Sequence, residues 1–291
     1  MKAPPFAYVR ATSLADAFQL WGASGANASL LAGGQSLLAT LAFRLREPGT
    51  LIDISRVAEL RGISELGDVI RIGALTTHAE LGANQLVRRH VPLLAEAVPL
   101  IAHASIRNRG TIGGSLAYAD PAAELPACTV ALEAVIITRS ASGERRMPAA
   151  RFFTGAYATA LAERELIVAI EFPVAKAGQR STILELARRS GDYAMAGIAA
   201  RAHTAAEELL APRLVFFSLG DGPILAQRAM AAIAGKPATP PTVALAQAAL
   251  DDDLNPPTDQ HGGPAMKLQI ARVLMARALE RITESSRVRA A

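Results

Sequence analysis

The chain has 291 residues, 51% of them hydrophobic, with 30 Lys and Arg against 26 Asp and Glu for a net charge of +4. This length and apolar content suit two domains or one large one, and the lack of Lys/Arg blocks argues against nucleic-acid binding. Because no segment has the apolar run of a signal peptide or of a membrane span, we expect no membrane span and a soluble, cytoplasmic protein.

The first 57 residues are predicted to alternate helices with short buried strands. Ser13 is expected to cap a helix over 13–24, in which Leu14, Ala17 and Trp21 share one face. A β-α-β unit follows, with strands at 28–33 and 50–55 around a helix at 36–46 that ends before Pro48 and Gly49. Gly33 and Gly34 lie at its first turn, between strand and helix.

The segment 58–175 is predicted to be a second unit with more strands. Two strands are expected within 60–81, interrupted helix over 84–102, a strand pair within 132–153 and a strand at 165–174. The loop 105–120 is rich in glycine, and Asp120 followed by Pro121 is interpreted as the cap of the helix that contains Glu124.

Beyond the linker 175–182, the pattern predicts strands within 183–205 and 213–224, then three helices within 226–236, 241–254 and 264–286. We therefore place a domain boundary near 175, with a C-terminal domain over 176–285 and a frayed tail at 286–291. The sequence shows no internal repeat.

Cysteine and histidine usage argues against a metal site. Cys128 is the single cysteine and is interpreted as a small buried hydrophobe, whereas iron–sulfur clusters are usually held by four thiolates. The five histidines show no ligand spacing. His78 is interpreted as a loop histidine satisfied by the protein, with contact to a cofactor as the alternative.

Two glycine loops are the candidate binding site. Paired glycines before a helix let the backbone approach a ligand and leave N–H groups free for an anion, so "AGGQS" at 32–36 is a candidate phosphate loop. A turn that merely needs a positive φ is the alternative. A second loop with Gly110, Gly113 and Gly114 favours a diphosphate held from two sides, with Glu124 near a polyol hydroxyl.

These motifs carry a resemblance. "LAGGQSL", "TIGGSLAYADPAAELPA" and "LARRSGDYAMAG" resemble the FAD-binding medium subunits of the molybdenum hydroxylases, the family of xanthine dehydrogenase and carbon monoxide dehydrogenase. The resemblance covers nearly the whole chain. It implies an α+β fold: an FAD-binding module of the vanillyl-alcohol-oxidase (PCMH) type in two α/β subdomains, about 1–57 and 58–175, plus a C-terminal α+β domain.

The resemblance also implies which residues contact FAD. Both glycine motifs would hold the diphosphate mainly through backbone N–H groups, Glu124 would face the ribityl chain, Ile101 and Leu166 or Ile167 would contact the flavin, and Tyr193 would lie near its ring. The expected contact residues are Ala32, Gly33, Gly34, Gln35, Ser36, Leu37, Ile101, Thr111, Ile112, Gly113, Gly114, Ser115, Asp120, Glu124, Leu166, Ile167 and Tyr193. Two positions depart from the family pattern, because Glu185 stands where relatives often have Lys, and Gln35 where some have His.

The resemblance finally implies an electron-transfer role. FAD would receive electrons from a small iron–sulfur subunit, a large molybdenum subunit would oxidise the substrate, and an external acceptor would take the electrons from FAD. A self-contained flavin oxidoreductase and a non-enzymatic assembly scaffold are the alternatives. The sequence identifies neither the organic substrate nor the acceptor.

Overall fold

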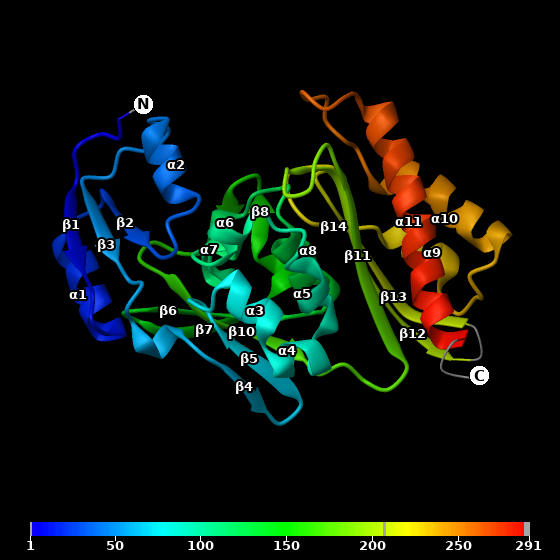
Figure 1. Cartoon of the computed structure of the whole chain (residues 1–291), viewed down its shortest axis with the longest axis horizontal. Coiled ribbons are helices and arrows are strands. Elements are labelled where there is room, and N and C mark those ends of the chain that lie inside the picture. Colours follow the sequence, from blue (N-terminus) through cyan, green and yellow to red (C-terminus); the bar gives the residue numbers. More distant parts are fainter. Residues whose placement is uncertain (1, 206–207, 288–291) are drawn as a thin grey trace.

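The computed structural model describes residues 2–205 and 208–287, and it sets three parts side by side in chain order (Figure 1). The N-terminal part is a parallel sheet in the order β1-β3-β2 with two helices. Strands β2 and β3 pair in parallel and are joined through α2, so the predicted β-α-β unit is confirmed. The elements are β1 (Ala7–Arg10), α1 (Leu14–Ala23), β2 (Ala28–Leu31), α2 (Leu37–Ala42) and β3 (Thr50–Asp53).

The predicted helix over 36–46 is too long by one turn. Helix α2 ends at Ala42 because Arg44 takes a left-handed conformation (φ 56°) and Leu45 N–H donates back to Thr40 O at 2.9 Å. Leu45 is consequently 74% exposed, whereas Leu41 is buried. The leucines of this segment therefore do not share one buried face.

The central part is an antiparallel sheet in the order β4-β5-β10-β6-β7 with a set of short helices packed against it. The predicted strand pairs are confirmed. The helix expected over 84–102 is interrupted, because Pro92 opens a new helix, and it ends at Ala97 rather than at residue 102. The elements are η1 (Ala58–Leu60), β4 (Ile63–Leu66), β5 (Val69–Gly73), α3 (His78–Ala83), α4 (Gln85–His90), α5 (Pro92–Ala97), α6 (Ala104–Arg107), α7 (Ile112–Tyr118), α8 (Glu124–Ala131), β6 (Val135–Ser140), β7 (Gly143–Pro148), η2 (Ala149–Arg151), β8 (Phe153–Gly155), β9 (Ala158–Thr159) and β10 (Leu166–Pro173).

The C-terminal part is an antiparallel four-stranded sheet with three helices on its outer face (Figure 1). Residues of β12 and β13 alternate in direction: Phe216 packs in the core beneath the helices, and Phe217 packs in the core of the central part. The elements are β11 (Gln179–Ala187), β12 (Ala194–Ala205), β13 (Glu208–Phe217), β14 (Ile224–Leu225), α9 (Gln227–Ile233), α10 (Pro240–Asp253) and α11 (Pro264–Arg287).

The predicted domain limits at 57 and 175 stay predictions. One hydrophobic cluster joins Leu14 and Ile52 of the N-terminal part to Leu166 and Val168 of β10, so the core crosses the first limit. The predicted tail is helical as far as Arg287, and its remaining residues lie outside the described part. Among the described residues, no helix has the length and apolarity needed to cross a membrane.

Candidate functional site

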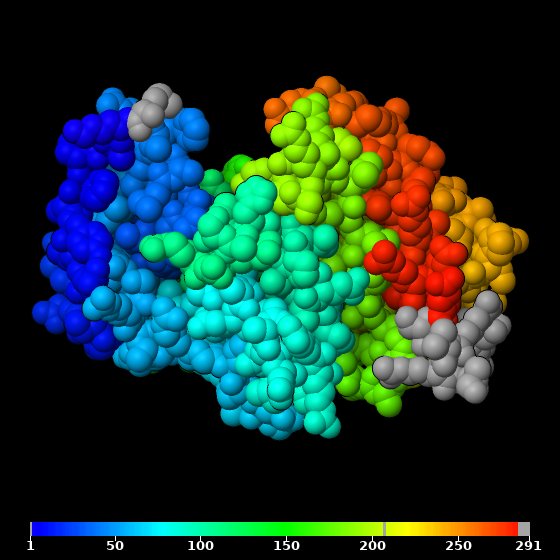
Figure 2. Space-filling model, in the orientation of Figure 1, coloured from blue at the N-terminus to red at the C-terminus, as the bar shows by residue number. Residues whose placement is uncertain are grey.

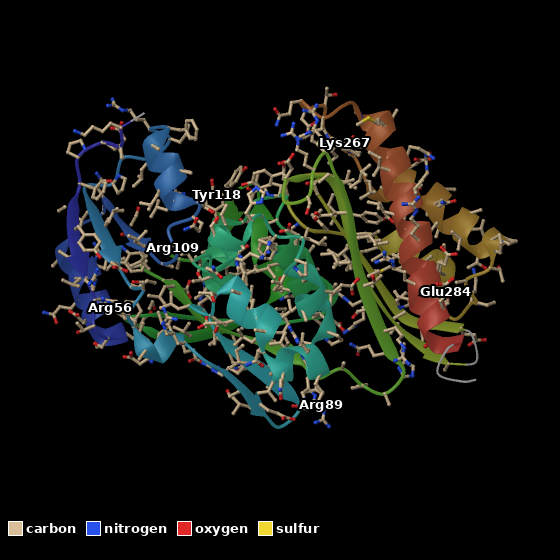
Figure 3. All side chains as sticks on the ribbon, viewed as in Figure 1. Arg56, Arg89, Arg109, Tyr118, Lys267 and Glu284 are labelled. Atoms are coloured by element: carbon tan, nitrogen blue, oxygen red, sulfur yellow. The ribbon has the colours of Figure 1, made fainter. Side chains whose placement is uncertain are left out.

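A cavity of about 530 Å³ is bordered by all three parts of the chain. Gly33 comes from the N-terminal part, Gly114 from the central part and Tyr193 from the C-terminal part. Figure 2 shows the molecule hollowed between the N-terminal part and the rest, and Figure 3 labels Arg109 and Tyr118 on the central side of this border. The volume lies within the roughly 300–1,000 Å³ of ordinary ligand pockets.

The cavity collects nearly all of the predicted contact residues, although they come from distant parts of the sequence. Ile112 is the exception, because its side chain is buried in the hydrophobic core. The predicted residues that line the cavity are Ala32, Gly33, Gly34, Gln35, Ser36, Leu37, Ile101, Thr111, Gly113, Gly114, Ser115, Asp120, Glu124, Leu166, Ile167 and Tyr193.

The two glycine loops touch one another. A Cβ atom on Gly33 would lie 2.0 Å from the carbonyl oxygen of Arg109 and 3.0 Å from Cα of Gly110, so only glycine fits there. Gly34 has φ +75°, a conformation that side chains disfavour. Gly33 is therefore required by the packing of the two loops, and Gly34 has the positive φ that was the alternative to a phosphate loop.

The first loop offers backbone donors to the cavity. Within the described residues, the N–H groups of Gly33, Gly34, Gln35 and Ser36 donate to no protein oxygen. The Gln35 side-chain amide donates to Gly33 O at 3.2 Å. Because unpaired N–H groups that converge beside a cavity attract anions, this loop has the chemistry of a phosphate site.

The second loop differs from the expectation that its backbone N–H groups hold a ligand. Ile112 N–H donates to Thr76 O at 3.0 Å and Gly113 N–H to Ala74 O at 2.8 Å. Gly114 N–H donates to Thr111 Oγ1 at 3.1 Å, which caps α7, and Ser115 N–H donates to Thr111 O at 3.0 Å. This loop therefore presents a glycine surface and the Ser115 side chain to the cavity, while its N–H groups fix the loop.

Asp120 does not cap α8, contrary to the expectation from the sequence. Its Oδ1 accepts a hydrogen bond from Ala122 N–H at 2.9 Å, which closes a turn over Pro121. Helix α8 begins only at Glu124, after Ala123. An Asp-Pro pair suits either structure, and the side-chain turn prevails here.

Carboxyl groups with raised pKa values gather at this end of the cavity. Burial, aided by the charges of Glu185 and Asp120, raises the pKa of Glu124 to about 8. Burial raises the pKa of Asp120 as well, and it raises that of Glu185 to about 7. Glu124 is therefore mostly protonated at neutral pH, and its carboxyl group is able both to donate and to accept a hydrogen bond.

Comparison with known proteins decides the family. The family model described as the FAD binding domain in molybdopterin dehydrogenase matches residues 4–175, and that of the CO dehydrogenase flavoprotein C-terminal domain matches residues 181–282. The chain belongs to the FAD-binding medium subunits of the molybdenum hydroxylases.

Relatives match this medium subunit over almost its full length. It is 38% identical to the 6-hydroxypseudooxynicotine dehydrogenase complex subunit alpha of Paenarthrobacter nicotinovorans, over 99% of this chain and 97% of that protein. A carbon monoxide dehydrogenase structure from Hydrogenophaga pseudoflava superposes with a TM-score of 0.94 at 38% identity, covering 96% of this chain and 98% of that one. Quinoline 2-oxidoreductase from Pseudomonas putida 86 gives a TM-score of 0.93 at 34% identity, with 98% and 99% covered.

Glu185, one of the two positions expected to depart from the family pattern, has an unusual environment. One of its carboxyl oxygens is buried and has no hydrogen-bond partner among the described residues. Since its pKa rises from about 4.5 to about 7, the folded chain holds a proton that the unfolded chain releases between these pH values. The free energy of unfolding must therefore fall as the pH rises through this window.

Replacing Glu185 by glutamine is expected to remove this decrease in the free energy of unfolding as the pH rises. Glutamine resembles the protonated acid, so E185Q and the parent should melt alike near pH 4.5, and E185Q should melt about 2–4 °C higher at pH 8. Calorimetry across this range measures the difference. The exposed Glu65 of β4 offers the matched control E65Q, which should leave the profile unchanged. Equal melting temperatures of E185Q and parent at pH 8 would show that Glu185 is solvated.

His78 was expected to be a satisfied loop histidine, with contact to a cofactor as the alternative, and it lies in the wall of the cavity. It is not a satisfied loop histidine, because it is buried at the first position of α3, lines the cavity, and neither ring nitrogen has a hydrogen-bond partner among the described residues. The signal that could have placed it is the pair Thr77 and Glu80, which forms a capping box around it. That pattern fixes the start of α3 and turns residue 78 inward.

Proposed function

We propose that this chain binds FAD in the cavity between its glycine loops and transfers electrons within a three-subunit complex. Electrons from an iron–sulfur small subunit would reach the flavin here and leave to an external acceptor, while a large molybdenum subunit oxidises the organic substrate. The observation that carries this proposal is the contact of Gly33 with the Arg109 carbonyl, because it joins two glycine loops into one wall of a large cavity.

The residues of the cavity fit a flavin dinucleotide. The free N–H groups from Gly33 to Ser36 would bind the diphosphate, and Ser115 would add a hydroxyl group from the opposite loop. Glu124, protonated at neutral pH, would hydrogen-bond the ribityl hydroxyls. Apolar side chains such as Ile101 and Ile167 would lie against the flavin. Bound FAD supplies the redox chemistry, and the protein supplies its position and electrostatic surroundings.

The electron donor must lie on another chain. Iron–sulfur clusters usually need four thiolates, and the single cysteine, Cys128, is fully buried in α8. The names of similar chains point to larger assemblies, since they are called subunits or medium chains. A cytoplasmic location stays a prediction from the sequence.

The organic substrate is proposed to bind elsewhere in the complex. Chains of 34–38% identity to this one carry names that refer to carbon monoxide, glyceraldehyde and 6-hydroxypseudooxynicotine. These compounds differ widely in size and chemical class, and yet the similarity of the chains is nearly uniform. The similarity of this subunit therefore carries no information on the substrate.

Reconstitution tests the proposal. The purified chain should show flavin absorbance without iron or molybdenum, and its flavin should be reduced in stopped flow by a dithionite-reduced iron–sulfur subunit freed of excess reductant. A substrate of the large subunit should reduce the flavin only when both partners are present. Stoichiometric iron in the isolated chain, or flavin reduction by that substrate without partners, would contradict the proposal and favour a self-contained oxidoreductase. A chain that binds no flavin, alone or with both partners, would favour the scaffold alternative.

A further inference from the structure

Arg145 and Glu165 form an ion pair in the wall of the cavity. Glu165 lines the cavity with a side chain that is 2% exposed, whereas the side chain of Arg145 is 49% exposed. The guanidinium donates to the carboxylate twice, through Nε to Oε1 at 2.7 Å and through Nη2 to Oε2. Because a contact at two points fixes the orientation of both groups, this pair holds Glu165 in one place.

The carboxylate of Glu165 has its remaining positions filled by two further donors. Thr138 Oγ1 of β6 donates to Oε1 at 2.5 Å, and Ala162 N–H donates to Oε2 at 2.7 Å. Hydrogen bonds from Arg145, and then from Thr138 and Ala162, lower the pKa of Glu165 to about 2. The carboxylate is therefore ionised at neutral pH, and each of its oxygens accepts two hydrogen bonds.

This ion pair holds both ends of the loop 160–165, which joins β9 to β10. Arg145 Nη2 also donates to Ala160 O at 2.9 Å, so one guanidinium binds the first and the last residue of the loop. Apolar side chains of the loop and of the start of β10 line the cavity, namely Leu161, Leu166 and Ile167. The position of these side chains therefore depends on a contact that lies behind them.

We propose that Arg145 is a positioning residue for FAD, which acts through Glu165 to hold the loop 160–165 and the start of β10 against the flavin. Arg145 does not itself line the cavity, so it acts on the cofactor only through these segments. This inference rests on the proposed function and adds to it a residue that the cofactor does not touch.

The neighbouring residue of β7 supplies a matched control. Arg146 forms an ion pair with Glu171 of β10, and its side chain is 53% exposed, close to the value for Arg145. Successive residues of a strand point to opposite faces of the sheet, so the two arginines reach different carboxylates. Neither Arg146 nor Glu171 lines the cavity.

The test compares R145M, R145K and R146M with the parent as full-length apoproteins. Calorimetry gives the dissociation constants for FAD, riboflavin and ADP, of which riboflavin carries the flavin ring without a diphosphate and ADP the diphosphate without a flavin. Hydrogen exchange of peptides that cover 160–166 reports on the loop in the absence of any ligand. Melting temperatures without ligand report on the stability of the whole chain.

We expect R145M to bind FAD and riboflavin about tenfold more weakly and ADP with parental affinity, because the loop contacts only the flavin. Amides over 160–166 should exchange about tenfold faster in R145M and at the parental rate in R146M. Both variants should melt about 3–10 °C below the parent, since each loses hydrogen bonds to a buried carboxylate. R146M should nevertheless bind all three ligands as the parent does.

The variant R145K should restore most of the binding. Lysine keeps a charged donor for Glu165 but lacks the guanidinium fork, so FAD should bind within about threefold of the parental affinity. An R145K variant as weak as R145M would contradict a role that depends on the bond to Glu165.

Other results would overturn the inference in distinguishable ways. Parental exchange over 160–166 in R145M would show that Arg145 does not hold the loop, whether or not FAD binds. Faster exchange with parental riboflavin affinity would show that the loop does not position the flavin. Equal weakening of ADP and riboflavin, or the same weakening in R146M, would show a general effect of lost stability. A parent that binds no flavin would refute the proposed function and this inference with it, whereas parental binding in R145M refutes only the role of Arg145.

Discussion

Replacing Gly33 by alanine is expected to abolish FAD binding and to lower the stability of the chain. The added Cβ would lie 2.0 Å from O and 2.7 Å from C of Arg109, and both atoms belong to the backbone. Backbone atoms cannot rotate away as the end of a side chain can, so one loop must move away from the other. Overpacking of this kind costs about 1–3 kcal/mol, and the movement separates the two loops that together form one wall of the cavity.

Gly22 supplies the matched control for this prediction. It lies in α1, and a Cβ atom there would meet nothing within 4 Å. G22A should therefore keep the parental FAD affinity and gain about 0.5–1 kcal/mol, because alanine favours the helix. Denaturant titration of both variants measures the change in stability, and their flavin content measures the loss of FAD binding. If G33A bound FAD and unfolded like the parent, the loops would not need their close contact.

The sequence was a reliable guide to elements whose pattern is set by local rules. The β-α-β unit was predicted from short apolar runs on either side of a helical segment, and the antiparallel pairs β4–β5 and β6–β7 from strand-like runs around turn residues. The end of α2 was not predictable in this way. Arg44 adopts the left-handed conformation that glycine usually takes at the end of a helix. Because the sequence has no glycine at this position, it gave no sign that the helix ends here.

The candidate site was predictable where the backbone requires glycine. It was less predictable where a backbone N–H group can donate either to a ligand or to another part of the protein. The adjacent Gly33 and Gly34 indicated the first loop from the sequence alone. The N–H groups of the second loop were expected to face the ligand, but the carbonyls of Ala74 and Thr76 take two of them, and that pairing depends on the tertiary fold. The inward ring of His78 likewise follows from packing on Gly110.

Replacing Gly114 by valine is expected to abolish FAD binding while the fold persists, in contrast to G33A. Gly114 lines the cavity within α7, and its Cβ would meet only Thr111 Oγ1, at 2.8 Å. Rotation of that hydroxyl relieves the contact and costs about 1 kcal/mol of helix capping. The rest of the valine side chain would then occupy the surface that the cofactor approaches.

The matched control is G22V, which places the same β-branched side chain on a helix outside the cavity. G22V should keep about the parental stability, because its side chain meets open space and valine is no worse a helix former than glycine. Only G114V should lose flavin absorbance after purification and show no saturable binding of added FAD. G114A should fall between G114V and the parent, because its single methyl group reaches less far into the cavity. Stoichiometric flavin in G114V would mean that the cofactor does not approach this loop, and it would remove the second glycine motif from the proposed site.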